Sequence, residues 1–218
     1  MKTLSLKPIP FAYEKTLWLL AIVALVFNLF GCNKSRPGKA RVLLFTKSTG
    51  FRHTSIPQGI AAISKLGQEN GFVVDTTENA SYFNEDSLAK YAAVIFLHTT
   101  GDLLNQYQEA DFERYIQSGG GYIGIHAAAD AEYDWGWYGR LVGGYFESHP
   151  EQQVAKLLVK DSNHLSTRHL PHEWQRKDEW YNYKNLDSSV HVVLTIDEKK
   201  LPGRQEWRQP PHGLVPRF

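Results

Sequence analysis

Short apolar runs that alternate with helix-spaced segments constrain the fold of this chain more than any other feature. The run VLLFT is apolar throughout, which is typical of a strand buried on both faces of a sheet. Four strand-like runs occur, at residues 42–46, 72–76, 92–97 and 122–125. Between them, one helical pattern runs from Ile56 to a stop at Gly71, and an amphipathic one covers residues 107–117. This alternation predicts an α/β fold with a central, mainly parallel sheet and helices on both faces.

Polar loops follow three of the predicted strands. They read KSTGFRH (residues 47–53), HTTGD (98–102) and HAAAD (126–130). Ligands of parallel sheets bind beyond the carboxyl ends of the strands, so we expect the functional site among these loops. From about residue 132 the chain becomes aromatic and glycine-rich, with further strand-like runs at 154–159 and 190–195.

The N-terminal segment has the features of an export signal. Lysines precede the apolar run of residues 16–30, which is short for a membrane span. The run ends in LFGC, which resembles a bacterial lipobox with Cys32 as the lipidated residue. We therefore expect a lipoprotein signal peptide over residues 1–32, a polar tether over 33–40, and lipid anchoring in the bacterial cell envelope, in the periplasm or at the cell surface. An uncleaved membrane anchor is the alternative.

Charge and cysteine content exclude several functions. The formal net charge of +1 gives no electrostatic basis for binding nucleic acid. Cys32 is the only cysteine of the chain, so the folded part has neither an internal disulfide nor a thiol nucleophile. The composition does not fix an oligomeric state.

The segment GGGYIGIHAAAD, residues 119–130, predicts a buried strand that ends in a tight turn into a helix. His126 lies at that turn, where an imidazole can act as a general base or as a metal ligand. A helix cap or a core position is the alternative role for this side chain.

Two further histidines can reach the same edge of the sheet. His53 lies in the loop after the first strand and His149 ends the aromatic segment. Three imidazoles with an open fourth position suit a divalent metal such as zinc, so we expect His53, His126 and His149 as its ligands. Their spacing matches no short metal motif, and backbone-bonded loop histidines are the alternative. We assign His98 a supporting role.

Several long motifs occur together in one order. TKSTGFRHTSIPQGI, LHTTGD, the block from GGGYIGIHAAAD to FESHP, and DEWYNY resemble the ThuA-like (trehalose-utilisation) family from about residue 41 to about residue 202. The resemblance implies a flavodoxin-like three-layer sandwich similar to class I glutamine amidotransferases. Those enzymes carry a catalytic cysteine at the turn where this chain has His126, so cysteine-dependent amidotransferase chemistry is excluded.

The resemblance also implies a carbohydrate substrate, a disaccharide such as trehalose or a keto-sugar. We predict a lyase, isomerase or hydrolase in which His126 and His53 are catalytic and Glu179 supplies the carboxylate partner. The residues expected to bind substrate are Arg52, Asp130, Trp135 and Tyr181. For Trp135, sugar stacking and packing within the domain both remain open. A non-catalytic carbohydrate-binding lipoprotein is the alternative function.

The C-terminal segment GRQEWRQPPHGLVPRF does not resemble the end of a domain. The resemblance stops at about Pro202. We hypothesise that the reading frame changes near Gly203, which would make residues 203–218 an atypical tail and leave the domain truncated at its C-terminus.

Overall fold

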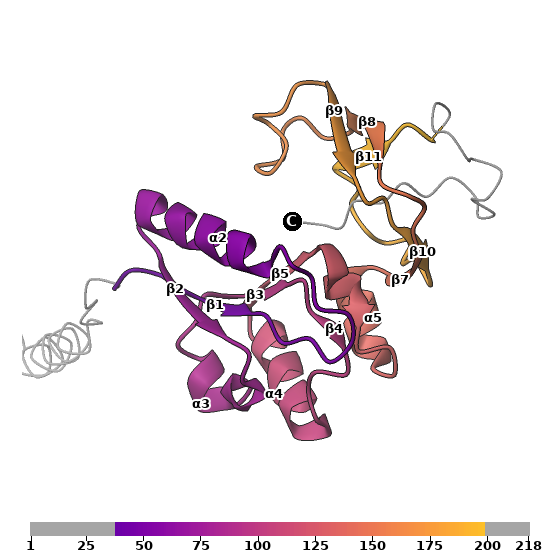
Figure 1. The fold of residues 1–218 in the computed structure, drawn as a ribbon. Coiled ribbons are helices and arrows are strands. Elements are labelled where there is room, and N and C mark those ends of the chain that lie inside the picture. The colour runs from indigo at the N-terminus through magenta and orange to yellow at the C-terminus, as the bar shows by residue number, and fades with distance from the viewer. Residues whose placement is uncertain (1–37, 199–218) are drawn as a thin grey trace, which may run out of the picture. The chain divides into compact units, whose positions relative to one another are not determined.

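A four-stranded parallel sheet forms the centre of the computed structural model, which describes residues 38–198 (Figure 1). The strand order is β2-β1-β3-β5. The strands are β1 (Arg41–Phe45), β2 (Val73–Thr77), β3 (Ala93–Leu97) and β5 (Gly121–Ile125). Each coincides, within a residue or so at its ends, with one of the four apolar runs. The predicted α/β fold with a central parallel sheet is thus confirmed.

Helices cover both faces of this sheet. Helix α2 (Ile56–Asn70) lies on one face, and α3 (Glu85–Leu88) and α4 (Gln106–Gln117) lie on the other (Figure 1). Helix α2 ends as the sequence predicts, because Gly71 adopts a left-handed φ of 76° that favours glycine. The result is a three-layer sandwich.

The side chains of β3 alternate between the two faces of the sheet and pack into a separate core cluster on each face. Phe96 packs on the α4 side, where its ring centroid lies 5.5 Å from that of Phe112. Ile95 and Leu97 point to the other face and pack with Ile60 of α2. Since both faces of the strand are buried, its carboxyl end is held in a fixed position beneath the loops.

Two small antiparallel sheets follow the aromatic segment. Strands β8 (Gln153–Val159), β9 (Glu173–Asp178) and β11 (Leu194–Ile196) pair in the order β11-β8-β9, and β7 (Tyr145–Ser148) pairs with β10 (Asn182–Lys184). The strand expected at 154–159 is confirmed as β8. The run at 190–195 forms a strand only at its end, as β11. Strand β9 was not predicted, because its residues EWQRKD are mostly polar and exposed.

No α-helix begins directly after β5, so that part of the prediction is wrong. His126–Ala129 form a single 3₁₀ turn, η2. The chain then extends into β6 (Asp130–Ala131), which pairs in parallel with β4 (Thr100–Gly101). The backbone N–H and C=O groups that bond to β4 are not available for the hydrogen bonds of a helix. The remaining short helices are η1 (Ala80–Tyr82) and α5 (Gly136–Val142).

Several sequence predictions fall beyond the described residues. The signal peptide, Cys32, most of the tether and the tail at 203–218 all lie outside residues 38–198. The predicted domain limits therefore stay predictions. Within 38–198, none of the helices combines the length and the apolar character that a membrane crossing requires.

Candidate functional site

Two neighbouring strands place His98 and His126 side by side. Strands β3 and β5 pair in register, with Leu97 opposite Ile125, so the next residue of each strand is a histidine. The His98 backbone N–H donates to the Ile125 carbonyl at 3.2 Å. Both histidines have a left-handed φ, 52° for His98 and 53° for His126. This conformation costs about 1–2 kcal/mol for a residue other than glycine and is concentrated at functional sites.

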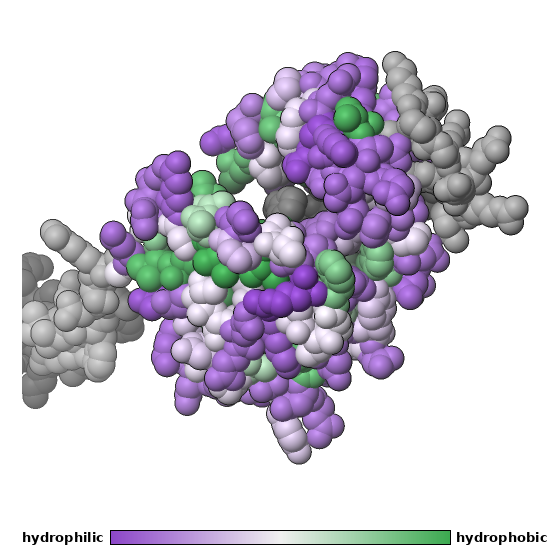
Figure 2. Space-filling view, viewed as in Figure 1, coloured by the Kyte–Doolittle hydropathy of each residue, from purple (hydrophilic) through white to green (hydrophobic). Residues whose placement is uncertain are grey.

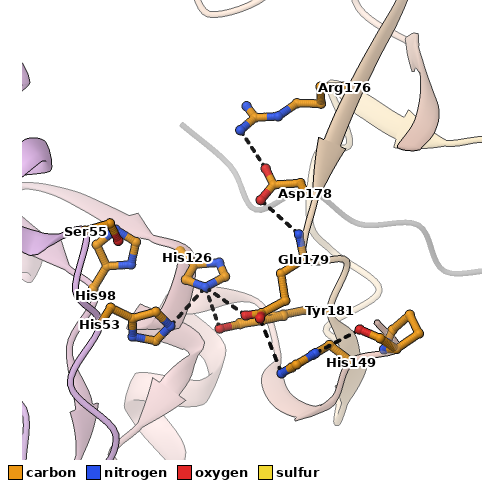
Figure 3. A network of polar contacts seen from close by, with 10 residues as sticks. His53, Ser55, His98, His126, His149, Arg176, Asp178, Glu179 and Tyr181 are labelled. Carbon is orange, nitrogen blue, oxygen red and sulfur yellow. Dashed lines mark hydrogen bonds and ion pairs between the residues drawn. The ribbon is translucent and has the colours of Figure 1, made fainter. Parts of the chain in front are cut away.

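His53, in the loop between β1 and α2, completes a histidine cluster with His98 and His126 (Figure 3). Its ring centroid lies 4.9 Å from that of His98 and 4.8 Å from that of His126. One ring nitrogen from each of the three residues lies within 4.8 Å of the others. Three separate loops at the carboxyl edge of the sheet thus converge on one point.

The surroundings keep this cluster uncharged. Burial, together with the neighbouring imidazoles, lowers the pKa of His98 and of His126 to about 4. Burial also lowers the pKa of His53, although the carboxylates of Glu179 and Asp130 oppose the effect. Neutral imidazoles have a free lone pair for a metal ion or a proton.

The hydrogen bonding of the cluster is incomplete. Among the described residues, the buried Nδ1 atoms of His53 and His98 have no hydrogen-bond partner. The Nε2 atom of His126 has too many neighbours, with His53 Nε2 at 3.2 Å, Tyr181 Oη at 2.9 Å and Glu179 Oε2 at 3.2 Å (Figure 3). A neutral imidazole nitrogen carries one N–H or one lone pair, so it cannot bond fully to all three.

A divalent cation fits this arrangement. Two nitrogens that bind one tetrahedral zinc at about 2.0–2.1 Å lie roughly 3.3 Å apart, close to the spacing of the His53 and His126 Nε2 atoms. The ligands are neutral imidazoles, the commonest metal-binding side chains. The Nε2 atoms of His53 and His126 thus have the chemistry and the spacing of two ligands of one metal ion.

Glu179 and Tyr181 come to the cluster from the segment after β9. Asp178 accepts the backbone N–H of Glu179 at 2.9 Å and pairs with Arg176 at 2.7 Å, which fixes the start of this segment. The Tyr181 ring lies 4.4 Å from His126 between centroids. Burial raises the pKa of Tyr181, and the nearby Glu179 charge raises it further, so its hydroxyl keeps its proton.

His149, expected as the third metal ligand, lies on the far side of Glu179. Its Nε2 is 3.6 Å from Glu179 Oε1, while its Nδ1 donates to the Pro150 carbonyl at 3.0 Å. The structure brings His98 to the cluster in its place. The signal for His98 was present in the sequence, because HTTGD and HAAAD both place a histidine directly after a strand.

Among the residues predicted to be catalytic or to bind substrate, Glu179 and Tyr181 contact His126, and the others have different partners. Arg52 pairs with Glu78 at 2.5 Å and donates to the Thr46 carbonyl at 3.4 Å. Asp130 accepts a hydrogen bond from Tyr133 at 2.5 Å. Trp135 packs against the core, which favours the packing alternative for its ring.

Comparison with known proteins gives a family and a fold. A family model described as ThuA, trehalose utilisation, matches residues 41–213. The structure resembles a putative ThuA-like protein from Bacteroides uniformis ATCC 8492, with a TM-score of 0.66 and 24% identity over 79% of this chain and 74% of that one. It also resembles a putative ThuA-like protein from Parabacteroides merdae ATCC 43184, with a TM-score of 0.62 and 21% identity over 72% of this chain and 68% of that one. None of the curated proteins compared with the chain matches it.

Proposed function

The chain belongs to the ThuA family of trehalose utilisation, which gives it a role in carbohydrate metabolism, and on this premise we propose that it is a metal-assisted acid–base enzyme. Its substrate is a disaccharide such as trehalose or a keto-sugar, and its reaction is a lysis, an isomerisation or a hydrolysis. We further propose that Cys32 is lipidated and tethers the enzyme to the cell envelope.

One observation carries the proposal, namely an uncharged histidine cluster with a carboxylate at its edge. Glu179 Oε2 lies 3.2 Å from His126 Nε2, and the Glu179 side chain is still 19% exposed. A carboxylate that contacts both the histidine cluster and solvent can exchange protons with a bound substrate.

Each residue has a defined part in this proposal. His53, His98 and His126 would hold a divalent cation such as zinc, which when bound polarises a sugar oxygen as a Lewis acid. Glu179 takes a proton from a sugar carbon or hydroxyl, or returns one to a leaving oxygen, at Oε2. Tyr181 keeps its proton and donates a hydrogen bond to a substrate oxygen. His149 contacts the other oxygen of Glu179 and limits the rotation of the carboxylate.

Replacement of Glu179 tests this function. The full chain, loaded with zinc, is assayed for turnover of trehalose, other disaccharides and keto-sugars. We expect Glu179→Gln to lower kcat by at least about 10²-fold while the metal content is unchanged, because general acid–base groups contribute about 10²–10⁴-fold. The control is Glu69→Gln, an exposed carboxylate near the end of α2.

The outcomes separate the two functions under consideration. Unchanged turnover in Glu179→Gln would contradict the acid–base role. Sugar binding without turnover in the unaltered chain would instead support the non-catalytic carbohydrate-binding protein.

A further inference from the structure

Enzymes of sugars commonly pack the apolar face of the substrate on an aromatic ring, and most rings near this site are already occupied. Trp135 stacks on Trp137 at 5.1 Å and on Tyr138 at 5.7 Å between centroids. The Tyr133 ring lies 5.1 Å from that of Tyr145 at an interplanar angle of 32°, and the ammonium of Lys184 lies 4.6 Å from its centroid. The two tryptophan rings and that of Tyr138 thus pack on one another, and Tyr133, although 39% exposed, already has an ammonium over its ring.

Phe51 differs from them in its exposure and its neighbour. It is 69% exposed, and its ring lies perpendicular to that of His53 with 4.9 Å between centroids. Hydrophilic side chains predominate on the face shown in Figure 2, and single exposed apolar residues need no functional explanation. Phe51 combines this exposure with direct contact to a member of the histidine cluster, so we expect a molecule bound at the cluster to meet this ring.

Hydrogen bonds to β4 and the residue after it hold the loop that carries Phe51. The Thr100 hydroxyl donates to the Phe51 carbonyl at 2.9 Å, and the Thr49 N–H donates to the Thr100 carbonyl at 2.9 Å. The Thr49 hydroxyl donates to the Asp102 carbonyl at 2.9 Å. Gly101, with a φ of 79°, allows this close approach, since a Cβ there would lie 2.3 Å from Thr49 Oγ1. The backbone is therefore fixed before a ligand binds, which lowers the entropic cost of binding.

We propose that Phe51 is the sugar-stacking residue of this site and packs against the apolar face of a pyranose ring held at the histidine cluster. This inference rests on the proposed function for the class of its substrate. It assigns to Phe51 the stacking role that the sequence suggested for Trp135.

Binding of trehalose to the full, zinc-loaded chain, measured by isothermal titration calorimetry, tests the assignment. We expect Phe51→Ala to weaken binding about tenfold, which corresponds to ~1.4 kcal/mol. Phe51→Tyr keeps the ring and should bind within about twofold of the unaltered chain. Leu66→Ala removes another exposed apolar side chain, 51% exposed on α2, and should have no effect. Zinc content is measured for all variants, and equal values show that the cluster is intact.

The results distinguish failure of this inference from failure of the proposed function. Equal affinity of Phe51→Ala and the unaltered chain would overturn the role of Phe51 and leave the enzyme proposal standing. Loss of affinity in Phe51→Ala without any sugar turnover would support the stacking role while the acid–base proposal fails. Absence of binding of trehalose, of other disaccharides and of keto-sugars to the unaltered chain would overturn both.

Discussion

Glu132 is a buried carboxyl group whose replacement should change how stability depends on pH. It is only 4% exposed, and its Oε1 accepts the backbone N–H groups of Leu103 at 3.1 Å and Leu104 at 2.9 Å. Glu132→Gln keeps an acceptor oxygen at this position and removes the charge. The comparison therefore isolates the cost of ionising a buried carboxyl group.

The magnitude follows from the pKa of this carboxyl group. Burial raises the pKa of Glu132 from 4.5 to about 7, although the two N–H donors oppose the effect. Because the folded state holds the proton more tightly, the stabilisation is complete below pH 4.5 and is lost as the pH rises to about 7. At about 1.4 kcal/mol per pH unit, the interval from 4.5 to about 7 corresponds to roughly 3 kcal/mol.

Urea unfolding of both proteins at several pH values between 4.5 and 8 provides the assay. We expect the Gln variant to gain up to about 3 kcal/mol relative to the unaltered chain as the pH rises through this window. Other titrating groups, including the histidine cluster, are common to both proteins and cancel in the difference. A stability difference that stays constant across this range would refute the reasoning.

Three substitutions in the scaffold should lower the free energy of unfolding, measured by urea titration. Gly67→Ala should cost about 1–3 kcal/mol, because its Cβ would lie 2.9 Å from Val74 Cγ2 and from a backbone oxygen. Gly136→Ala is the control, because the nearest atom to its Cβ would be Arg140 Nη1 at 4.0 Å. Phe96→Ala should cost about 3–5 kcal/mol, since this fully buried ring packs against those of Phe83 and Phe112. Asn105→Ala should cost ~1 kcal/mol, because its side chain caps α4. Values near zero would contradict each argument.

The layered fold could be predicted because the local signals agree with the tertiary structure. Strands buried on both faces must be continuously apolar, so residues 42–46 and 92–97 stood out in the sequence. Gly71 ended α2 where a left-handed residue was expected. Strand β9 was missed because its stabilisation comes from pairing with β8, while its own side chains are polar and exposed.

The composition of the histidine cluster could be predicted only in part, for a related reason. His53 and His126 were identified from loops at the carboxyl edge of the sheet. The sequence did not establish that His98 belongs to the cluster, because its position depends on the register of β3 and β5. The pairing of Leu97 with Ile125 brings His98 beside His126. The expected helix after His126 failed because β6 pairs with β4, a contact between segments about 30 residues apart that no local pattern indicates. Side-chain exposure, which separates Phe51 from Trp135, likewise depends on tertiary packing.

The metal content of the purified full chain tests the central claim most directly. Elemental analysis after equilibration with zinc and removal of excess ion is carried out on the unaltered chain, on His98→Ala and on His149→Ala. The account predicts about one zinc per chain, lost in His98→Ala and retained in His149→Ala, because three histidine ligands suit a catalytic zinc and His149 lies outside the cluster. Retention of zinc in His98→Ala together with its loss in His149→Ala would contradict the account.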